Sequence, residues 1–241
     1  MLHKTSGIIL YTTKYSDTSL ITKIYTSDFG LQSYIINGVR SKKSKNKASL
    51  FQPMALVDLV VPNSGKGNLQ RISEINNQHP YNDIPYNIVK SSIAIFLNEI
   101  LYKTLKEEHA DEELFEFIKN SLLILDLKTD NCSSFHIYFL IQLSRFLGFY
   151  PQGDYSDETT FFDLKEGRFV LNIPSHSNYL TKENAFILDK LTKVNYESLS
   201  LLKINKNQRK ELLQQVIWFY QLHISSIGDI KSVDILEEVI A

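Results

Sequence analysis

Residues 6–39 read SGIILYTTKYSDTSLITKIYTSDFGLQSYIINGV and predict three consecutive β-strands. In 6–15, side chains alternate between two faces with the period of two that is typical of a strand. The segments 20–26 and 31–39 follow. The residues SDFG between them are typical of a hairpin turn that ends at Gly30. The chain therefore begins as a sheet.

Two further strands are predicted downstream, at 54–61 (MALVDLVV) and 68–76 (NLQRISEIN), with the turn PNSGKG at 62–67 between them. Five short strands without a long helical stretch favour a small closed sheet. The five-stranded OB barrel is the common small fold of this kind, and it often binds single strands or oligonucleotides. We therefore expect an OB-fold nucleic-acid-binding domain over 1–80.

From about residue 80 the apolar period becomes helical, which predicts a mainly α-helical domain over 81–241. An irregular segment at about 150–178 interrupts it and holds a predicted hairpin, TTFFDLKEGRFVLNI. The predicted helices cover about 89–105, a stretch capped by Asp111, a stretch from Ser133 or Ser134 to about 147, a stretch from Thr181, 208–227 and 232–240. The fold class is α+β with two domains.

Composition places the chain among ordinary soluble proteins, with 43% hydrophobic and 22% charged residues. No stretch approaches the roughly 18 apolar residues of a membrane span, so we expect no membrane contact. The single cysteine, Cys132, excludes an internal disulfide and a cysteine-based zinc cluster. A reducing, cytoplasmic setting fits.

Charge is distributed unevenly along the chain, although the formal net charge is only -1. Residues 1–80 hold ten Lys and Arg against four Asp and Glu, whereas 81–241 hold sixteen against twenty-three. Such asymmetry indicates a nucleic-acid-facing module attached to an acidic remainder.

The basic side chains concentrate in GVRSKKSKNK, residues 38–47, between two predicted strands. Dense positive charge on a loop is typical of a surface that holds phosphates. The alternative is a solvated, disordered loop. The candidate DNA contacts are Arg40, Lys42, Lys43, Lys45 and Lys47, with Lys66 and Arg71 extending the path on the barrel.

Three tyrosines on the predicted strands, Tyr11, Tyr25 and Tyr34, are candidates for base stacking if their rings face outward. The alternative for each is a packing role in the barrel core or between strands.

No catalytic or metal-binding pattern is present in the sequence. The six histidines form no HExxH, the glycines at Gly65 and Gly67 do not make a GxxxxGK[ST] phosphate loop, and there is no GxSxG. We therefore expect a binding protein and no enzyme activity.

Several short motifs occur in an order and spacing that match a known family. They are GIILYTTKYSDTSLITKIYTSDFGLQSYIINGVRSKKSK at 7–45, LFQPM at 50–54, DEELF at 111–115, LGFYP at 147–151, and YQLH at 220–223 followed by IKS at 230–232. On these motifs, which span nearly the whole chain, the protein resembles the RecO family of bacterial recombination mediators and DNA-repair proteins.

The resemblance implies an N-terminal OB barrel joined to a helical domain, without catalytic turnover. It implies binding of single- and double-stranded DNA, annealing of complementary strands, and help in loading RecA together with RecR. It also implies a pocket for the C-terminal tail of the single-strand-binding protein, apolar with a basic rim, in the helical domain. The third predicted helix has apolar residues for such a pocket, but Arg145 is its only cation.

One departure from the family concerns a zinc site. Many similar proteins hold zinc with four cysteines after the motif LGFYP, whereas residues 152–177 of this chain contain no cysteine. We therefore predict that no zinc or other cofactor is bound. The hairpin would instead be stabilised by packing of Phe161, Phe162, Phe169 and Leu171.

Three functional hypotheses follow from these patterns. The first is a DNA-binding mediator of recombinational repair, cytoplasmic and associated with the nucleoid. The second is a non-catalytic interaction scaffold whose acidic helical domain binds partners while the basic loop is only a tether. The third is an enzyme with an unfamiliar site. Reversing the charges of Lys42, Lys43 and Lys45 separates the first from the second, because only the first requires them.

Overall fold

The computed structural model describes residues 1–37, 39, 48–62, 69–105, 109–129 and 131–240. The chain forms two compact units, Met1–Leu127 and Lys128–Ala241, and each is described by itself. The domain boundary predicted between residues 80 and 81 follows the change from strands to helices. It stays a prediction, because the compact units group the first two helices with the strands.

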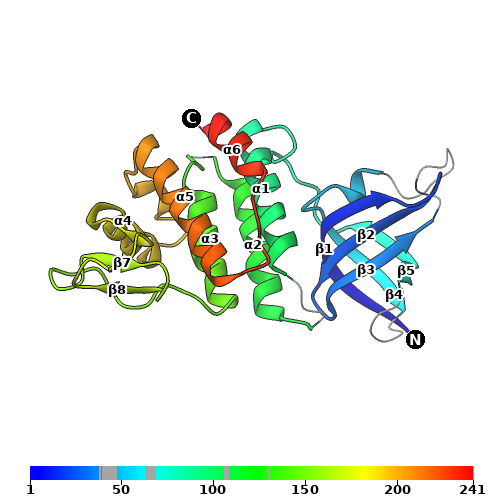
Figure 1. Ribbon diagram of the computed structural model, residues 1–241. Coiled ribbons are helices and arrows are strands. Elements are labelled where there is room, and N and C mark those ends of the chain that lie inside the picture. Colours follow the sequence, from blue (N-terminus) through cyan, green and yellow to red (C-terminus); the bar gives the residue numbers. More distant parts are fainter. Residues whose placement is uncertain (38, 40–47, 63–68, 106–108, 130, 241) are drawn as a thin grey trace. The chain divides into compact units, whose positions relative to one another are not determined.

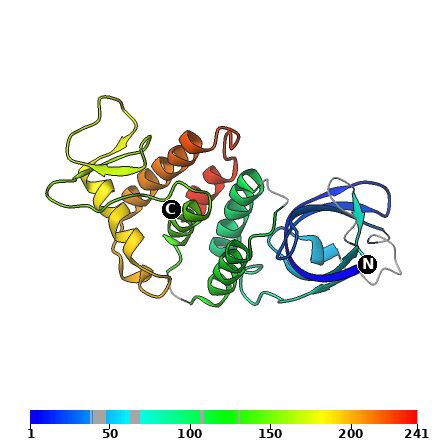
Figure 2. The same ribbon diagram turned by 90° about the horizontal axis from the view of Figure 1, so that it is seen from below.

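In the first unit, the described strands form one curled sheet in the order β5-β3-β2-β1-β4-β6 (Figures 1 and 2). The strands are β1 (Leu2–Lys14), β2 (Leu20–Thr26), β3 (Gly30–Ile36), β4 (Leu56–Pro62), β5 (Gln70–Arg71) and β6 (Glu74–Asn77). A short 3-10 turn, η1 (Ala48–Phe51), precedes β4. The N-terminal OB-like sheet predicted from the sequence is therefore confirmed.

The predicted fifth strand is split into two short strands that pair with opposite edges of the sheet. β5 runs parallel to β3, whereas β6 runs antiparallel to β4. Between them, Ile72 N donates to Ile35 O at 3.2 Å and Ser73 N donates to Val60 O at 2.9 Å. One segment thus satisfies the backbone groups of both edges, which would otherwise be exposed to other chains.

The long strand β1 pairs with β4 through its first half and with β2 through its second half. Its register shifts between Ile9 and Tyr11, as at a β-bulge, and leaves the carbonyl of Leu10 outside the ladder. Asn98, on helix α1 (Ile88–Thr104), donates its side-chain amide to Leu10 O at 3.0 Å. The helix therefore docks on the strand at the bulge.

Inward-facing apolar side chains fill the barrel, and Gly7 allows two strands to approach closely. The core cluster comprises Ile9, Ile24, Tyr34, Ile36, Val39, Phe51, Val57, Leu59, Val61, Ile72 and Ile75. A Cβ at Gly7 would lie 2.5 Å from Ile24 Cγ2 and 3.1 Å from Leu59 Cδ1. Only glycine fits at this point without movement of the core.

A buried carboxylate ties the chain that leaves the barrel to the end of helix α2 (Glu112–Leu127). Asp126 accepts backbone hydrogen bonds from Asn82, Asp83 and Ile84 at 2.8, 2.9 and 2.9 Å. The buried Lys90 donates to Asp126 O at 2.8 Å and pairs with Asp83 at 2.7 Å. At the other end of α2, the predicted cap is confirmed, because Asp111 Oδ1 accepts from Leu114 N at 2.9 Å.

The second unit is mainly helical, with a small sheet. Its helices are α3 (Phe135–Phe146), α4 (Lys182–Lys193), α5 (Lys206–His223) and α6 (Ser232–Ile240), with a 3-10 turn η2 (Leu199–Leu201). The predicted hairpin is present as β7 (Phe161–Asp163) and β8 (Arg168–Val170), and β9 (Tyr179–Leu180) completes a sheet of order β8-β7-β9 in the described residues. Helix α5 lies two residues earlier at its start and four earlier at its end than the predicted 208–227.

Candidate nucleic-acid interface and partner pocket

The predicted phosphate contacts fall mostly outside the described residues. Arg40, Lys42, Lys43, Lys45, Lys47 and Lys66 all lie in the undescribed ranges. Arg71 is described, and it lies exposed on β5 opposite Ile35 of β3. Their role as DNA contacts stays a prediction.

Two of the three candidate stacking tyrosines are core residues, which corrects the base-stacking hypothesis for them. Tyr34 is 1% exposed within the barrel cluster, and burial raises its pKa to about 12. Tyr25 is 3% exposed because its ring packs on Phe115 of α2, at 6.2 Å between centroids. Their rings have no open face for a base, so the packing alternative holds for both.

Tyr11 differs, because this residue is 44% exposed. Its ring stacks on Tyr102 of α1, with centroids 5.1 Å apart and planes 28° apart. Lys23, the register partner of Tyr11 on β2, places its ammonium 5.2 Å from the centre of the Tyr102 ring. An aromatic pair and a cation therefore share one surface of the barrel unit.

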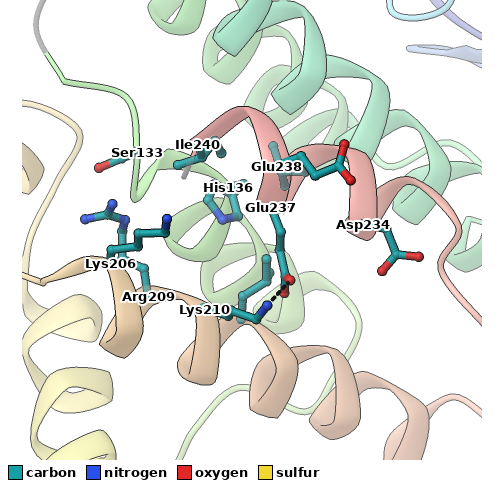
Figure 3. A pocket seen from close by; sticks show the side chains of 11 residues that line it. Ser133, His136, Lys206, Arg209, Lys210, Asp234, Glu237, Glu238 and Ile240 are labelled. Carbon is teal, nitrogen blue, oxygen red and sulfur yellow. Dashed lines mark ion pairs between the residues drawn. The ribbon is translucent and has the colours of Figure 1, made fainter.

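The second unit contains a pocket of about 590 Å³ between α3, α5 and α6 (Figure 3). Lys206 and Arg209 lie on one side of it, Asp234 and Glu238 on the other, and His136 lies between them. The lining residues are Ser133, His136, Lys206, Arg209, Lys210, Leu213, Asp234, Leu236, Glu237, Glu238 and Ile240.

The basic side of the pocket is built by the first turns of α5. The helix begins at Lys206 because Asn205 accepts a hydrogen bond from Gln208 N at 3.0 Å, while the Gln208 side chain accepts from Asn205 N at 3.0 Å, a complete capping box. Lys206, Arg209 and Lys210 are three and four residues apart, so one helix face carries all three cations. The positive end of the helix dipole adds to their potential.

Burial sets the charge states inside the pocket. Burial, and then the neighbouring Arg209 charge, lower the pKa of His136 from 6.5 to about 3, so its imidazole is neutral at pH 7. Burial also lowers the pKa of Arg209, which nevertheless remains a cation at neutral pH. Arg209 donates from Nη1 to Ile204 O at 2.7 Å, and this bond fixes the guanidinium at the pocket rim.

Helix α6 supplies both apolar and acidic groups to the same pocket. Lys210 Nζ lies 3.0 Å from Glu237 Oε2, and Gln214 Nε2 donates to Glu237 Oε1 at 2.6 Å. Among the described residues, Lys206 and Arg209 have no carboxylate within 4.0 Å. The pocket thus joins apolar lining residues to two cations that no described carboxylate neutralises.

These cations were missed by sequence reasoning, which looked for them on α3. Part of the signal was present, since Arg209 and Lys210 lie in the predicted helix 208–227, whereas Lys206 lies before its predicted start and joins α5 only in the structure. What the sequence lacked was the pairing of α3 with α5, whose pocket residues are about 70 positions apart.

The hairpin region does not suit the four-cysteine zinc site of similar proteins, because residues 152–177 contain no cysteine. The described part of the chain has no group of three or more His, Cys, Asp or Glu placed to hold a metal ion. That the protein binds no zinc stays a prediction. Phe162 and Phe169 do pack at 5.0 Å and are buried, whereas Leu171 is 57% exposed and takes no part in this packing, contrary to expectation.

The described helices include none that is both long and apolar enough to cross a bilayer.

Comparison with known proteins agrees with this architecture. Residues 1–81 match the family model described as "Recombination protein O N terminal", and residues 85–232 match "Recombination protein O C terminal". The chain belongs to the RecO family. The family resemblance inferred from the motifs is therefore confirmed.

RecO proteins of several bacteria are similar to the chain over its full length. DNA repair protein RecO of Phocaeicola vulgatus is 38% identical over 239 residues, 99% of each chain. The RecO proteins of Bacteroides fragilis, 38% identical over 240 residues and 99% of each chain, and Flavobacterium psychrophilum, 34% over 239 residues and 98% of each chain, carry the same name. The chain is accordingly a RecO-family DNA repair protein.

Proposed function

We propose that this RecO-family chain binds single- and double-stranded DNA through its barrel unit and anneals complementary strands in recombinational repair. The observation that carries the proposal is a family-matched OB-like barrel encoded by a segment with ten cations and four acids. Cations that contact phosphates release condensed counterions, so binding is expected to weaken steeply with salt. Five contacts to a single strand correspond to a log–log slope of about −3.5.

The test is a titration of a fluorescent oligonucleotide at several salt concentrations, with annealing measured alongside. Reversal of Lys42, Lys43 and Lys45 to Glu should abolish annealing and flatten the salt slope. A matched control reverses three exposed lysines of the second unit, Lys165, Lys182 and Lys203, which changes the net charge equally. Equal effects of the two triple variants would contradict a role for the basic loop and favour the scaffold alternative.

The pocket between α3, α5 and α6 suits the C-terminal tail of the single-strand-binding protein, the partner that the family implies. The pocket lining combines the apolar Leu213, Leu236 and Ile240 with Lys206 and Arg209. An acidic peptide that ends on an apolar side chain suits this lining if its carboxylates lie on the side of the two cations, away from Asp234 and Glu238. Losing a hydrogen bond to a charged group costs about 1.5–3 kcal/mol, or roughly 10- to 150-fold in affinity.

Anisotropy of a labelled peptide with the tail sequence of the organism's own single-strand-binding protein tests this assignment. Arg209→Gln should weaken the complex within that range, whereas Lys203→Gln, an exposed cation outside the pocket, should not. Unchanged affinity in Arg209→Gln would place the tail elsewhere.

The remaining roles follow from the same family. Together with RecR, the protein would assist the loading of RecA on strands coated with single-strand-binding protein, in the cytoplasm at the nucleoid. We expect binding without turnover and without a cofactor. Metal-dependent cleavage of labelled DNA by the purified protein, retained through a second purification, would contradict this expectation.

A further inference from the structure

The outer surface of the barrel unit carries an aromatic pair that joins a strand to a helix. Tyr11 lies immediately after the bulge in β1, and its ring stacks on Tyr102 near the end of α1 at 5.1 Å. The hydrogen bond from Asn98 to Leu10 O, 3.0 Å long, holds the helix against the strand one residue away from Tyr11. Rigid elements therefore position both rings.

This arrangement leaves Tyr11 partly open, unlike Tyr25. Tyr102 stacks against one face of the Tyr11 ring, and the residue nevertheless remains 44% exposed, which leaves the opposite face and the ring edge for a further contact. Tyr25, on the neighbouring strand, is covered by Phe115 and only 3% exposed. A ring already ordered on one side loses little conformational entropy when a second planar group stacks on the other.

A cation stands beside the pair. Lys23 faces Tyr11 across the β1–β2 ladder and holds its ammonium 5.2 Å from the Tyr102 ring centre. Its three N–H groups find no carboxylate within 4.0 Å among the described residues. An open aromatic face next to an available cation is the combination that binds a nucleobase together with its phosphate.

We propose that Tyr11, supported by Tyr102 and flanked by Lys23, is a stacking platform for an unpaired nucleobase. This inference rests on the proposed DNA binding and adds a site within it. Because bases inside a duplex have both faces stacked on neighbours, the platform contributes to the binding of single strands and not to binding along a duplex. Sequence selectivity is not expected, since every base offers a flat face.

The test compares Tyr11→Leu with Tyr86→Leu, the same exchange at a tyrosine that is 84% exposed and whose ring makes no contact with this pair. Base stacking on an aromatic side chain corresponds to roughly a 5- to 150-fold change in affinity. Tyr11→Leu should weaken single-strand binding by this factor and leave unchanged the binding of a duplex whose two ends are closed by hairpin loops. Tyr11→Phe, which keeps the ring, should bind like the wild type, as should Tyr86→Leu.

Salt dependence separates stacking from charge. Tyr11→Leu should leave the log–log slope unchanged, because no cation is lost, whereas Lys23→Gln should reduce it by about 0.7. If Tyr11→Leu fails to fold, photocrosslinking of the wild type to an oligonucleotide containing 5-iodouracil decides the matter, since the crosslinked peptide should contain Tyr11. Crosslinks only at other sites would overturn the inference.

Loss of DNA binding and loss of the platform give different results. If the wild type binds no single strand at low salt, the proposed DNA binding is wrong. If the wild type binds and Tyr11→Leu binds equally well, DNA binding stands and the platform is refuted.

Discussion

Replacement of Asp126 by Asn tests whether one carboxylate holds the first unit together. Oδ1 accepts from Asp83 N and Ile84 N, and Oδ2 accepts from Asn82 N. Asparagine keeps a single oxygen, so its amide group must face the N–H of Asn82, donor against donor. The substitution changes neither the size nor the shape of the side chain appreciably.

The expected loss of stability can be estimated from these bonds. Losing one hydrogen bond to a charged acceptor removes about 1.5–3 kcal/mol. The other two bonds lose their charge assistance, which adds on the order of 1 kcal/mol. We therefore expect Asp126→Asn to lower the free energy of unfolding of the first unit by about 2–4 kcal/mol, a large share of the roughly 5–15 kcal/mol typical of a domain.

The effect has a defined pH dependence. Burial acts to raise the pKa of Asp126, but the amides of Ile84, Asn82 and Asp83, with Lys90, outweigh it and lower the pKa below its usual value. A carboxyl with a depressed folded pKa stabilises above its unfolded pKa, about 3.9, and loses this contribution as pH falls toward the folded pKa. The difference in the free energy of unfolding between wild type and variant should be largest at pH 7 and should shrink below about pH 4.

Urea unfolding at pH 7 and at pH 3, with hydrogen exchange of the amides at 82–84, measures both quantities. Asp17→Asn, at an exposed carboxylate, is the matched control and should stay within about 0.5 kcal/mol of the wild type. The reasoning is refuted if Asp126→Asn is as stable as the wild type at pH 7, or if the gap grows in acid.

Three other substitutions probe the barrel core, the pocket and the start of α5. Gly7→Ala should lower the free energy of unfolding of the first unit, measured in urea, by about 1–3 kcal/mol, because the new Cβ would overlap Ile24. Unchanged stability would show that the strands can separate there. His136→Gln should flatten the fall in melting temperature between pH 6.5 and 4, since only the unfolded wild type takes up the proton in that range; equal slopes would contradict a neutral buried imidazole. Asn205→Ala should cost about 1 kcal/mol through loss of the capping box, whereas Asn205→Asp should be tolerated.

The strands and helices were largely predictable because their patterns are local. Alternation located the first four strands, and helical spacing located α1 and α6 nearly to the residue. The split of the fifth strand was not predictable, since it depends on which two edges lie on either side of Ser73. The start of β1 at Leu2 escaped notice because its pairing partner, Pro62, is 60 residues away.

The site was less predictable than the fold because it depends on what covers each strand. Alternation puts Tyr25 on an outward position but cannot show that α2 covers it. It puts Tyr11 on the same face as the core residue Ile9, and it cannot show the bulge that turns Tyr11 outward. Tyr102 could not be linked to Tyr11 from sequence, because the bulge at Leu10 sets where α1 docks. Two of the pocket cations, Arg209 and Lys210, were visible in the predicted helix, and what the sequence hid was the apolar lining that α6 adds beside them.

The ties from α1 and α2 to the barrel also have a consequence for biosynthesis. When the last barrel strand emerges from the ribosome at Asn77, the ring of Tyr25 and the carbonyl of Leu10 still lack their covers. Asp126 appears about 50 residues later, a delay of roughly 2–10 s at ordinary rates of translation. During that interval the surface around Tyr25 has no covering helix, so we expect the barrel to reach its final packing only after the second helix has been synthesised.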